Sequence, residues 1–234
     1  MKRLGIIGGL GPDATLYYYR TIVELSRRNL EPGKKHPEEE IIIYHVNQNQ
    51  CADFIESGRW KELADTLSEA IERLYRAGAD FAIIACNTAE MVFDAVKDRS
   101  SIPLLSIVEE TCKAVSGLGL RKVGLLGTRM TMQGGFYQTV FNKENISIVV
   151  PGREEQELIH DKIITELVSG IIREETYSEL MRITRRMVED DSIRGLILGC
   201  TELPLIMTGE EPGLPFFNTS TIHARAAFNY SVSS

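Results

Sequence analysis

Two of the four cysteines stand in matching surroundings that could support proton transfer at a carbon atom. Cys86 and Cys200 each follow a strand-like apolar run, and small polar residues follow each of them. A thiol between a buried strand and a helix is expected to have a lowered pKa, because the helix dipole and nearby N–H donors favour the thiolate. Two such thiols on opposite sides of one carbon would suit racemisation next to a carboxylate, which needs a base on one face and an acid on the other.

The small polar residues that follow the two cysteines could bind a small anion. They are Asn87, Thr88, Thr201 and Glu202. Their hydroxyl and amide groups can cap a helix, and they can also hydrogen-bond a carboxylate. A lone cysteine at a strand end is more often a small buried hydrophobe, but the paired context favours a functional role.

The other two cysteines lack such surroundings. Cys112 lies in a helical stretch and is predicted to belong to the core. Cys51 follows the loop-like segment 47–50 and is predicted to be a bystander. No pair has CxxC spacing, so neither a zinc knuckle nor a thioredoxin-type pair is expected, and the cysteines are expected to be reduced thiols.

The residues around these cysteines predict an α/β fold, in which strands alternate with helices. Continuous apolar strands separated by helices indicate parallel sheets that are covered on both faces. The predicted strands are 4–7, 40–46, 81–85, 102–105, 123–126, 146–150 and 195–198. The predicted helices are 13–28, 61–76, 89–97, 133–141, 154–169 and 178–190.

The chain also repeats itself. Residues 3–9 resemble residues 122–128, and residues 83–90 resemble the segment that begins at residue 197. This pattern predicts two similar α/β domains with parallel-sheet cores, related by a pseudo-two-fold axis: an N-terminal domain of residues 1–116 with 208–234, and a C-terminal domain of residues 117–207. The ends of equivalent strands would then face each other across an interdomain cleft, where open α/β sheets bind their ligands.

Composition and charge exclude several classes of protein. The chain has 234 residues, enough for two small domains, and its formal net charge of −7 argues against a nucleic-acid partner. No apolar run reaches the roughly 18 residues of a membrane span, and no secretory leader is recognisable. The four histidines show no metal-ligand spacing, so no metal is predicted. The sequence therefore predicts a cytoplasmic protein without a membrane partner.

The segment 9–14, GLGPDA, matches the G-x-G-x-x-A pattern of dinucleotide-binding proteins. The following strand ends at Val46 and Asn47 rather than at the acidic residue that would bind a ribose, and Pro12 fits the first position of a helix. We therefore interpret this segment as a tight turn whose backbone N–H groups, near Leu10, could approach a carboxylate. No lysine stands in a recognisable pyridoxal-phosphate context, and no cofactor is expected.

Four segments together resemble the aspartate/glutamate racemase superfamily of cofactor-independent racemases. They are GIIGGLGP (5–12), ACNTAE (85–90), LLGTRMT (125–131) and LGCTELPLI (198–206), in the family's order. The resemblance implies a pair of α/β domains, with Cys86 and Cys200 as opposed acid and base. It also implies a small dicarboxylic amino acid as substrate, aspartate and possibly glutamate, and a homodimer.

The resemblance also indicates substrate-binding residues. Beside the cysteines it implies Asn87, Thr88 and Thr201, and in the GTxxT element Thr128 and Thr131. Some aspartate racemases place an arginine in the loop after the second strand, where this chain has amides, Asn47 and Gln48 among them. The family's further basic residue corresponds to Lys162 or to its neighbour His160. The predicted substrate-binding set is Leu10, Asn47, Gln48, Asn87, Thr88, Thr128, Thr131, Lys162, Thr201 and Glu202.

Other readings remain open within the resemblance. Related superfamily members isomerise maleate or racemise hydantoins, and a degenerate relative could bind a dicarboxylate without catalysis. Arylmalonate decarboxylases have one catalytic cysteine, so the pair disfavours that branch. Glutamate racemases of cell-wall synthesis usually have an Asp-Ser pair after the first strand, where this chain has Gly8 and Gly9.

Overall fold

The computed structural model describes residues 1–28, 40–208 and 214–233, which form two compact units. Unit 1 comprises Met1–Glu110 with Ser220–Ser234, and unit 2 comprises Thr111–Thr219. Each unit contains a four-stranded sheet with helices, so the predicted α/β class is confirmed. None of the helices in the described part of the chain combines the length and the apolar character needed to cross a bilayer.

The two sheets have the same strand order, and all their pairings are parallel. The first has the order β2-β1-β3-β4 and the second β6-β5-β7-β8, so that each strand of one has a counterpart in the other. This equivalence supports the internal duplication that the sequence repeat indicates. The strands are β1 (Leu4–Gly8), β2 (Ile41–His45), β3 (Phe81–Ile84), β4 (Leu104–Leu105), β5 (Lys122–Leu126), β6 (Ser147–Val149), β7 (Leu196–Leu198) and β8 (Phe216–Asn218).

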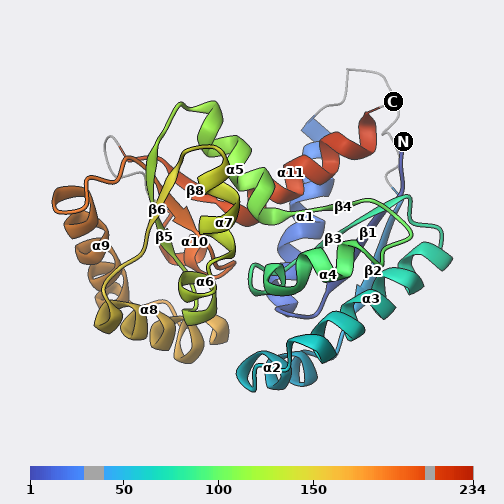
Figure 1. The fold of residues 1–234 in the computed structure, drawn as a ribbon, viewed down its shortest axis with the longest axis horizontal. Helices are drawn as coiled ribbons and strands as arrows, with labels where there is room; N and C mark the ends of the chain where they lie inside the picture. The colour runs from blue at the N-terminus through green and yellow to red at the C-terminus, as the bar shows by residue number, and fades with distance from the viewer. Residues whose placement is uncertain (29–39, 209–213, 234) are drawn as a thin grey trace. The chain divides into compact units, whose positions relative to one another are not determined.

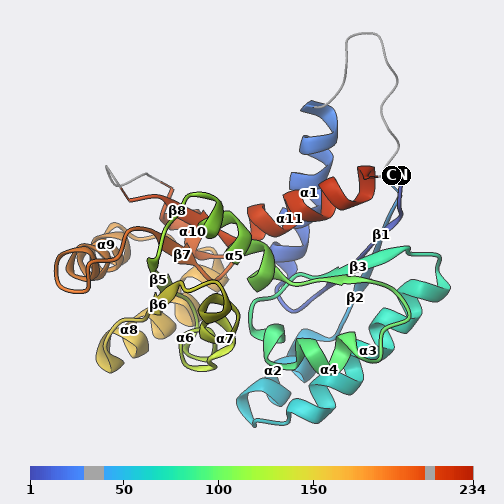
Figure 2. The same ribbon diagram turned by 45° about the horizontal axis from the view of Figure 1, so that its top comes forward.

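Helices cover both faces of the first sheet (Figures 1 and 2). On one face lie α1 (Pro12–Arg28) and α11 (Thr219–Val232); on the other lie α2 (Gln48–Glu56), α3 (Trp60–Arg76) and α4 (Phe93–Lys97). The strand residues alternate accordingly: Phe81 and Ile83 pack with α1 and α11, whereas Ala82 and Ile84 pack with α3 and α4. This alternation is the period of two that a strand imposes, and it lets one sheet serve two cores.

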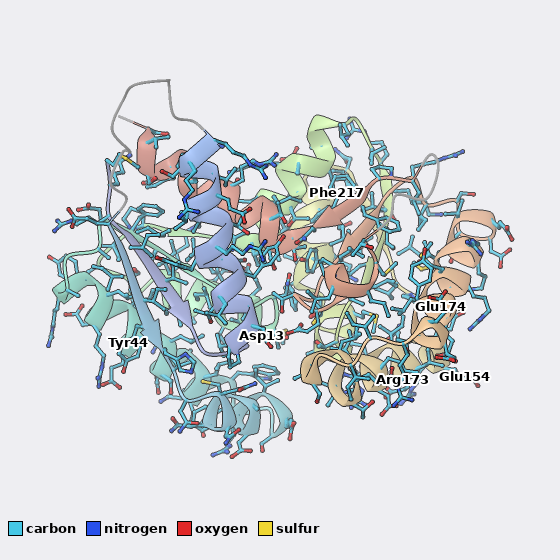
Figure 3. The ribbon with its side chains drawn as sticks, turned by 180° about the vertical axis from the view of Figure 1, so that it is seen from behind. Asp13, Tyr44, Glu154, Arg173, Glu174 and Phe217 are labelled. Atoms are coloured by element: carbon cyan, nitrogen blue, oxygen red, sulfur yellow. The ribbon has the colours of Figure 1, made fainter. Side chains whose placement is uncertain are left out.

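The second sheet packs against α8 (Arg153–Thr165) and α9 (Glu174–Glu189) on one face, through a cluster of buried aliphatic and methionine side chains. Both helices have acidic residues in their first turn, where the positive end of the helix dipole favours them. Figure 3 labels Glu154 and Glu174 there, together with Phe217 on β8. The remaining helices are α5 (Ile107–Gly117), α6 (Arg129–Gln133), α7 (Phe136–Lys143) and α10 (Leu203–Ile206), with 3-10 turns η1 (Thr88–Val92) and η2 (Leu167–Ser169).

Two expectations about local structure were wrong. The segment 47–50 is not a loop: Asn47 caps α2, its side-chain oxygen accepting a hydrogen bond from the N–H of Gln50 at 3.2 Å. The predicted helix 133–141 is two helices, because Gly135 adopts a positive φ of 75° between α6 and α7. Both errors arise because capping and breaking residues can be read more than one way from the sequence.

A buried histidine holds α11 to the first sheet and to α1. His223 lies on α11 and is fully buried, with its Nδ1 2.9 Å from the hydroxyl of Tyr18 and its Nε2 3.0 Å from the carbonyl oxygen of Leu105. Burial lowers the pKa of His223 to about 4. The ring is therefore neutral at pH 7, with Nε2 donating to Leu105 and Nδ1 accepting from Tyr18.

This histidine is expected to make the fold sensitive to acid. Because its pKa is lowered in the folded state, the stability it contributes is complete above about pH 6.5 and is lost as the pH falls towards about 4. The loss can reach about 3 kcal/mol. Urea unfolding between pH 4.5 and 7.5 should show a steeper decline for the native protein than for His223→Gln. Parallel profiles for the two proteins would contradict this assignment.

Candidate active site

Cys86 lies just beyond the carboxyl end of β3, a strand whose four residues are all buried. The chain leaves the sheet in a defined way, since the N–H of Ala85 still donates to the carbonyl of Ile7 at 3.0 Å. The chain then turns, and the N–H of Cys86 donates a hydrogen bond to the carbonyl of Ile84 at 2.8 Å. The thiol is half-buried, and η1 begins two residues later.

Cys200 has the equivalent place in unit 2, two residues after the end of β7. The N–H of Gly199 donates to the carbonyl of Leu126 at 2.7 Å, which brings the cysteine turn beside the turn after β5. A Cβ on Gly127 would lie 3.1 Å from the carbonyl oxygen of Gly199, so a glycine fits this close approach best. Cys200 is also half-buried. The structure thus confirms that both cysteines lie at the ends of equivalent strands.

The helical segment predicted at 89–97 is divided into η1 and α4, and no helix length was predicted after Cys200. The segment after Cys86 is a 3-10 turn of five residues, and α10 after Cys200 has four residues. A single turn has a small macrodipole, so the dipole contributes less to either thiolate than the sequence suggests. The remaining source of stabilisation is the set of hydrogen-bond donors in each turn.

Glu202 is a partner of the thiol of Cys200. The Cys200 Sγ donates to Glu202 Oε2 at 2.8 Å, and the Thr201 hydroxyl donates to the same oxygen at 2.7 Å. The Glu202 side chain is largely buried. A carboxylate in this position can take the thiol proton, but its charge also disfavours a thiolate beside it. Sequence reasoning assigned Glu202 to the substrate, and this contact with the thiol was not foreseen.

The two threonines of the GTxxT element lie at the start of α6. Thr128 caps this helix, its Oγ1 accepting from the N–H of Thr131 at 3.4 Å, and the two hydroxyl oxygens are 3.1 Å apart. The N–H of Arg129 donates to Nδ1 of His160 on α8 at 3.4 Å. Unit 2 therefore brings His160 close to this turn.

Lys162, the basic residue indicated by the resemblance, is engaged in ion pairs. Its Nζ lies 3.0 Å from Glu166 one turn later on α8 and 3.7 Å from Glu179 on α9. These carboxylates raise the pKa of Lys162, with the Glu166 hydrogen bond as the main cause. The positive charge is thus balanced within unit 2.

In unit 1, the predicted ligands lie at the carboxyl edge of the first sheet. Asn87 and Thr88 are buried in the turn after Cys86. Leu10, in the turn after β1, packs with Cys86 against one hydrophobic cluster. Asn47 follows β2, and since β1 lies between β2 and β3, it is on the other side of β1 from Cys86.

Sequence reasoning missed Glu90, although it closes the ACNTAE motif. Its carboxyl group accepts hydrogen bonds from the Ser106 hydroxyl at 2.7 Å and from the N–H of Ile107 at 3.1 Å. Burial raises the pKa of Glu90 to about 8, although these two hydrogen bonds lower it. A charged residue at the end of an otherwise uncharged motif was the signal that could have indicated it.

The four cysteines, all within the described residues, are not joined by disulfides, and their burial differs. Cys51 and Cys112 are 1% and 3% exposed, and burial raises the pKa of Cys51. Among the described residues, no group of three or more His, Cys, Asp and Glu side chains is arranged to hold a metal ion.

Iodoacetamide is expected to alkylate Cys86 and Cys200 before Cys51 and Cys112, because alkylation needs an accessible thiolate. Cys86 should react before Cys200, whose thiol faces the Glu202 carboxylate. Citrate should protect both thiols from alkylation, because the turn after each cysteine is expected to bind a carboxylate. Peptide mapping over a time course gives the order, and Glu202→Gln should bring the rate of Cys200 closer to that of Cys86. Early labelling of Cys112 would mean that the reactive thiols are misassigned.

Comparison with known proteins adds an independent observation. A model of the Asp/Glu/Hydantoin racemase family matches residues 7–227. The chain is 23% identical to the broad specificity amino-acid racemase RacX of Bacillus subtilis (strain 168) over 229 residues, 95% of each chain. Its sequence is 34% identical to that of an aspartate racemase homologue from Pyrococcus horikoshii OT3. The crystal structure of that protein matches with a TM-score of 0.85 and full coverage of both chains. The aspartate racemase of Picrophilus torridus shares the fold, with a TM-score of 0.77 at 21% identity over 99% of this chain and 94% of that one.

Proposed function

Because the chain belongs to the Asp/Glu/Hydantoin racemase family, we propose that it is a cofactor-independent racemase of aspartate and glutamate that uses Cys86 and Cys200. The observation that carries the proposal is the equivalence of the two cysteines. Each is the second residue after the strand that pairs with the first strand of its sheet, in two sheets of the same order. A reaction with one base and one acid on opposite faces of a carbon calls for two such groups.

In the proposed reaction, one thiolate removes the proton from Cα and the other cysteine, as thiol, returns a proton to the opposite face. The first step breaks the Cα–H bond and forms an S–H bond, which leaves the electron pair on the substrate as a carbanion. The second step forms a new Cα–H bond from the other thiol and leaves that sulfur as thiolate. The two roles reverse for the other enantiomer, so no proton is gained or lost overall.

The carbanion has to be stabilised, since the α-proton of an amino acid is very weakly acidic. We assign this to donors in the two cysteine turns and at the start of α6, where the Asn87 amide and the Thr201 and Thr128 hydroxyls are suited to the substrate carboxylate and amino group. Fixed donors act strongly where water is excluded. In the resting state the Cys200 thiol donates a hydrogen bond to the Glu202 carboxylate. Glu202 is therefore the group that we assign to accept the thiol proton when Cys200 must act as base.

Hydrogen exchange tests the proposal directly. The purified full chain, without added cofactor, is incubated with L-aspartate in D₂O, and the loss of the α-proton signal is followed by NMR while circular dichroism follows inversion. Exchange together with inversion is expected. Maleate and a 5-substituted hydantoin serve as alternative substrates. Turnover of either of these without exchange of aspartate or glutamate would replace the proposal by another reaction of the family, and binding without exchange would make the protein a dicarboxylate-binding relative.

The substrate range is expected to be broad. Asn47 and Gln48 offer amides where an arginine would clamp a side-chain carboxylate, and a charge-assisted arginine pair is about twice as strong as a neutral hydrogen bond. Lys162 and Arg59 are two cations that could replace such an arginine, and both have partners: Lys162 pairs with Glu166, and the guanidinium of Arg59 lies 4.6 Å from the ring centroid of Phe54. The broad specificity stated for RacX supports the same expectation.

We therefore expect kcat/KM for glutamate or asparagine within about two orders of magnitude of that for aspartate, a gap of roughly 3 kcal/mol. Measurement of all three L-amino acids on one preparation decides this. An advantage for aspartate of more than about four decades would mean that a cation binds its side chain, and that the amides after β2 are not the specificity determinant.

A further inference from the structure

Glu90 is a titratable side chain in η1, the 3-10 turn that follows Cys86. Its backbone N–H donates to the carbonyl of Asn87 at 3.1 Å and so closes the turn that begins at Cys86. Its carboxyl group reaches in the other direction, to Ser106 and Ile107 at the start of α5. Ser106 is itself the cap of α5, with its Oγ accepting from the N–H of Glu109 at 3.0 Å. One residue thus joins the cysteine turn to the end of β4 and the first turn of α5.

We propose that Glu90 is a positioning residue for Cys86, which fixes the cysteine turn against the start of α5 and carries a proton while it does so. This inference rests on the proposed racemase function for its effect on catalysis, but the contacts of Glu90 stand without that function. A protonated carboxyl group can accept from the Ile107 N–H through one oxygen and share a hydrogen bond with the Ser106 hydroxyl through the other.

The surroundings of Glu90 favour the uncharged acid. Two anionic groups, Asp94 on α4 and Glu109 on α5, raise the pKa of its carboxyl group. From α3, which packs against η1, the neighbouring core residues are apolar, Leu67 and Ile71 among them. A carboxylate charge on Glu90 would be repelled by both of these anions and poorly solvated.

Other buried groups in the same region are also neutral at pH 7. The fully buried phenol of Tyr18 has its pKa raised well above the usual value by burial, and Cys86 and Glu90 are both close enough to raise it further. Tyr18 bonds to His223, whose lowered pKa keeps it neutral. A Cys86 thiolate would therefore form while Tyr18, His223 and Glu90 are uncharged. Ionisation of Glu90 would add a second anion there, and like charges disfavour the thiolate.

The proposal predicts how pH affects stability and activity. Because burial raises the pKa of Glu90, the unfolded chain releases this proton at lower pH than the folded protein does. The stability that Glu90 contributes is therefore complete below about pH 4.5 and is lost as the pH rises through about 8. Glu90→Gln, which has the same shape as the protonated acid and cannot ionise, should remove this decline. Glu109→Gln removes a neighbouring anion and should move the transition to lower pH.

Three measurements on the full chain test the proposal, with Asp98→Asn as a matched control for the loss of an exposed acid. Carbon-detected NMR of the glutamate carboxyl carbons should show one group that titrates near pH 8, is absent in Glu90→Gln and moves to lower pH in Glu109→Gln. Urea unfolding should give a flatter alkaline profile for Glu90→Gln. In the racemase assay, Glu90→Ala should lower kcat by about 10²-fold with little change in KM, and Glu90→Gln should restore kcat to within about threefold at pH 7.

The outcomes separate this proposal from the proposed function. If no glutamate titrates above about pH 6, or if Glu90→Gln has the same alkaline profiles as the native protein, Glu90 does not carry a proton and the inference is wrong. If Glu90→Ala keeps the native kcat, Glu90 does not position Cys86. Absence of racemisation in the native protein would remove the proposed function, whereas the NMR titration and the urea profiles would still decide the state of Glu90. Should Glu90→Ala fail to fold, Glu90→Gln and Glu109→Gln carry the test.

Discussion

Cys86→Ser and Cys200→Ser are each expected to lower kcat for racemisation by about 10³-fold or more. A serine hydroxyl is not ionised at neutral pH, so it cannot take the Cα proton, and general acid–base catalysis by a positioned group contributes up to about 10⁴-fold. Circular dichroism of the aspartate solution measures the inversion. Each variant is also expected to keep one half-reaction, in which the remaining thiolate exchanges the α-proton of one enantiomer with D₂O.

The enantiomer that still exchanges should differ between the two variants, because in the proposed mechanism each cysteine serves one face of the substrate. Cys112→Ala is the matched control, since this cysteine is buried within α5 and does not follow a strand. It should keep its activity, with a modest loss of stability from the smaller side chain. Full racemisation by either serine variant, or exchange of the same enantiomer by both, would rule out the two-thiol mechanism.

Gly9→Ala is expected to destabilise the fold by about 3 kcal/mol or more, a large effect for a single methyl group. Gly9 has a positive φ of 89°, and a Cβ there would lie 2.5 Å from the carbonyl oxygen and 2.9 Å from the N of Val46. Both contacts are with backbone at the end of β2, which is paired with β1, so neither strand can move away without loss of the sheet. The backbone strain and the clash therefore both lower the stability of the Gly9→Ala variant, and their costs add.

Gly58→Ala separates the two causes. Gly58 also has a positive φ, of 66°, but the nearest atom to a Cβ there is Trp60 Nε1 at 3.9 Å. Only the backbone strain remains, and a loss of about 1 kcal/mol is expected. Urea unfolding of the two variants side by side gives both values. Equal losses would mean that the close approach of β2 to the turn after β1 is not a constraint.

The sequence predicted most of the sheet architecture because strands that are buried on both faces are apolar along their whole length. Seven of the eight strands were predicted, as was the equivalence of β1 with β5. The strand β8 was not predicted, and α11 was missed because its apolar residues do not form a single stripe. Both elements are fixed by tertiary contacts: Thr219 donates to the Leu198 carbonyl, and His223 to the Leu105 carbonyl.

The candidate site could be predicted as far as its residues depend on their place in the chain. Both cysteines follow buried strands, and that alone locates them at a carboxyl edge. Partnerships between side chains could not be predicted, because they depend on which rotamers and which neighbouring helices meet. The ion pair of Lys162 with Glu179 on another helix is one case, and the bonds of Glu90 to Ser106 and Ile107 are another.

The position of α11 determines the order in which the chain can fold as it is synthesised. Unit 2 is one continuous stretch, whereas unit 1 is completed by α11, which the ribosome produces after all of unit 2. Until then the face of the first sheet that carries Leu4 and Phe81 lacks the cover of Ala224 and Phe228. The nascent protein must therefore keep part of an apolar sheet face, the part that α1 does not cover, exposed while unit 2 emerges, and this is the interval in which chaperones would be expected to bind it.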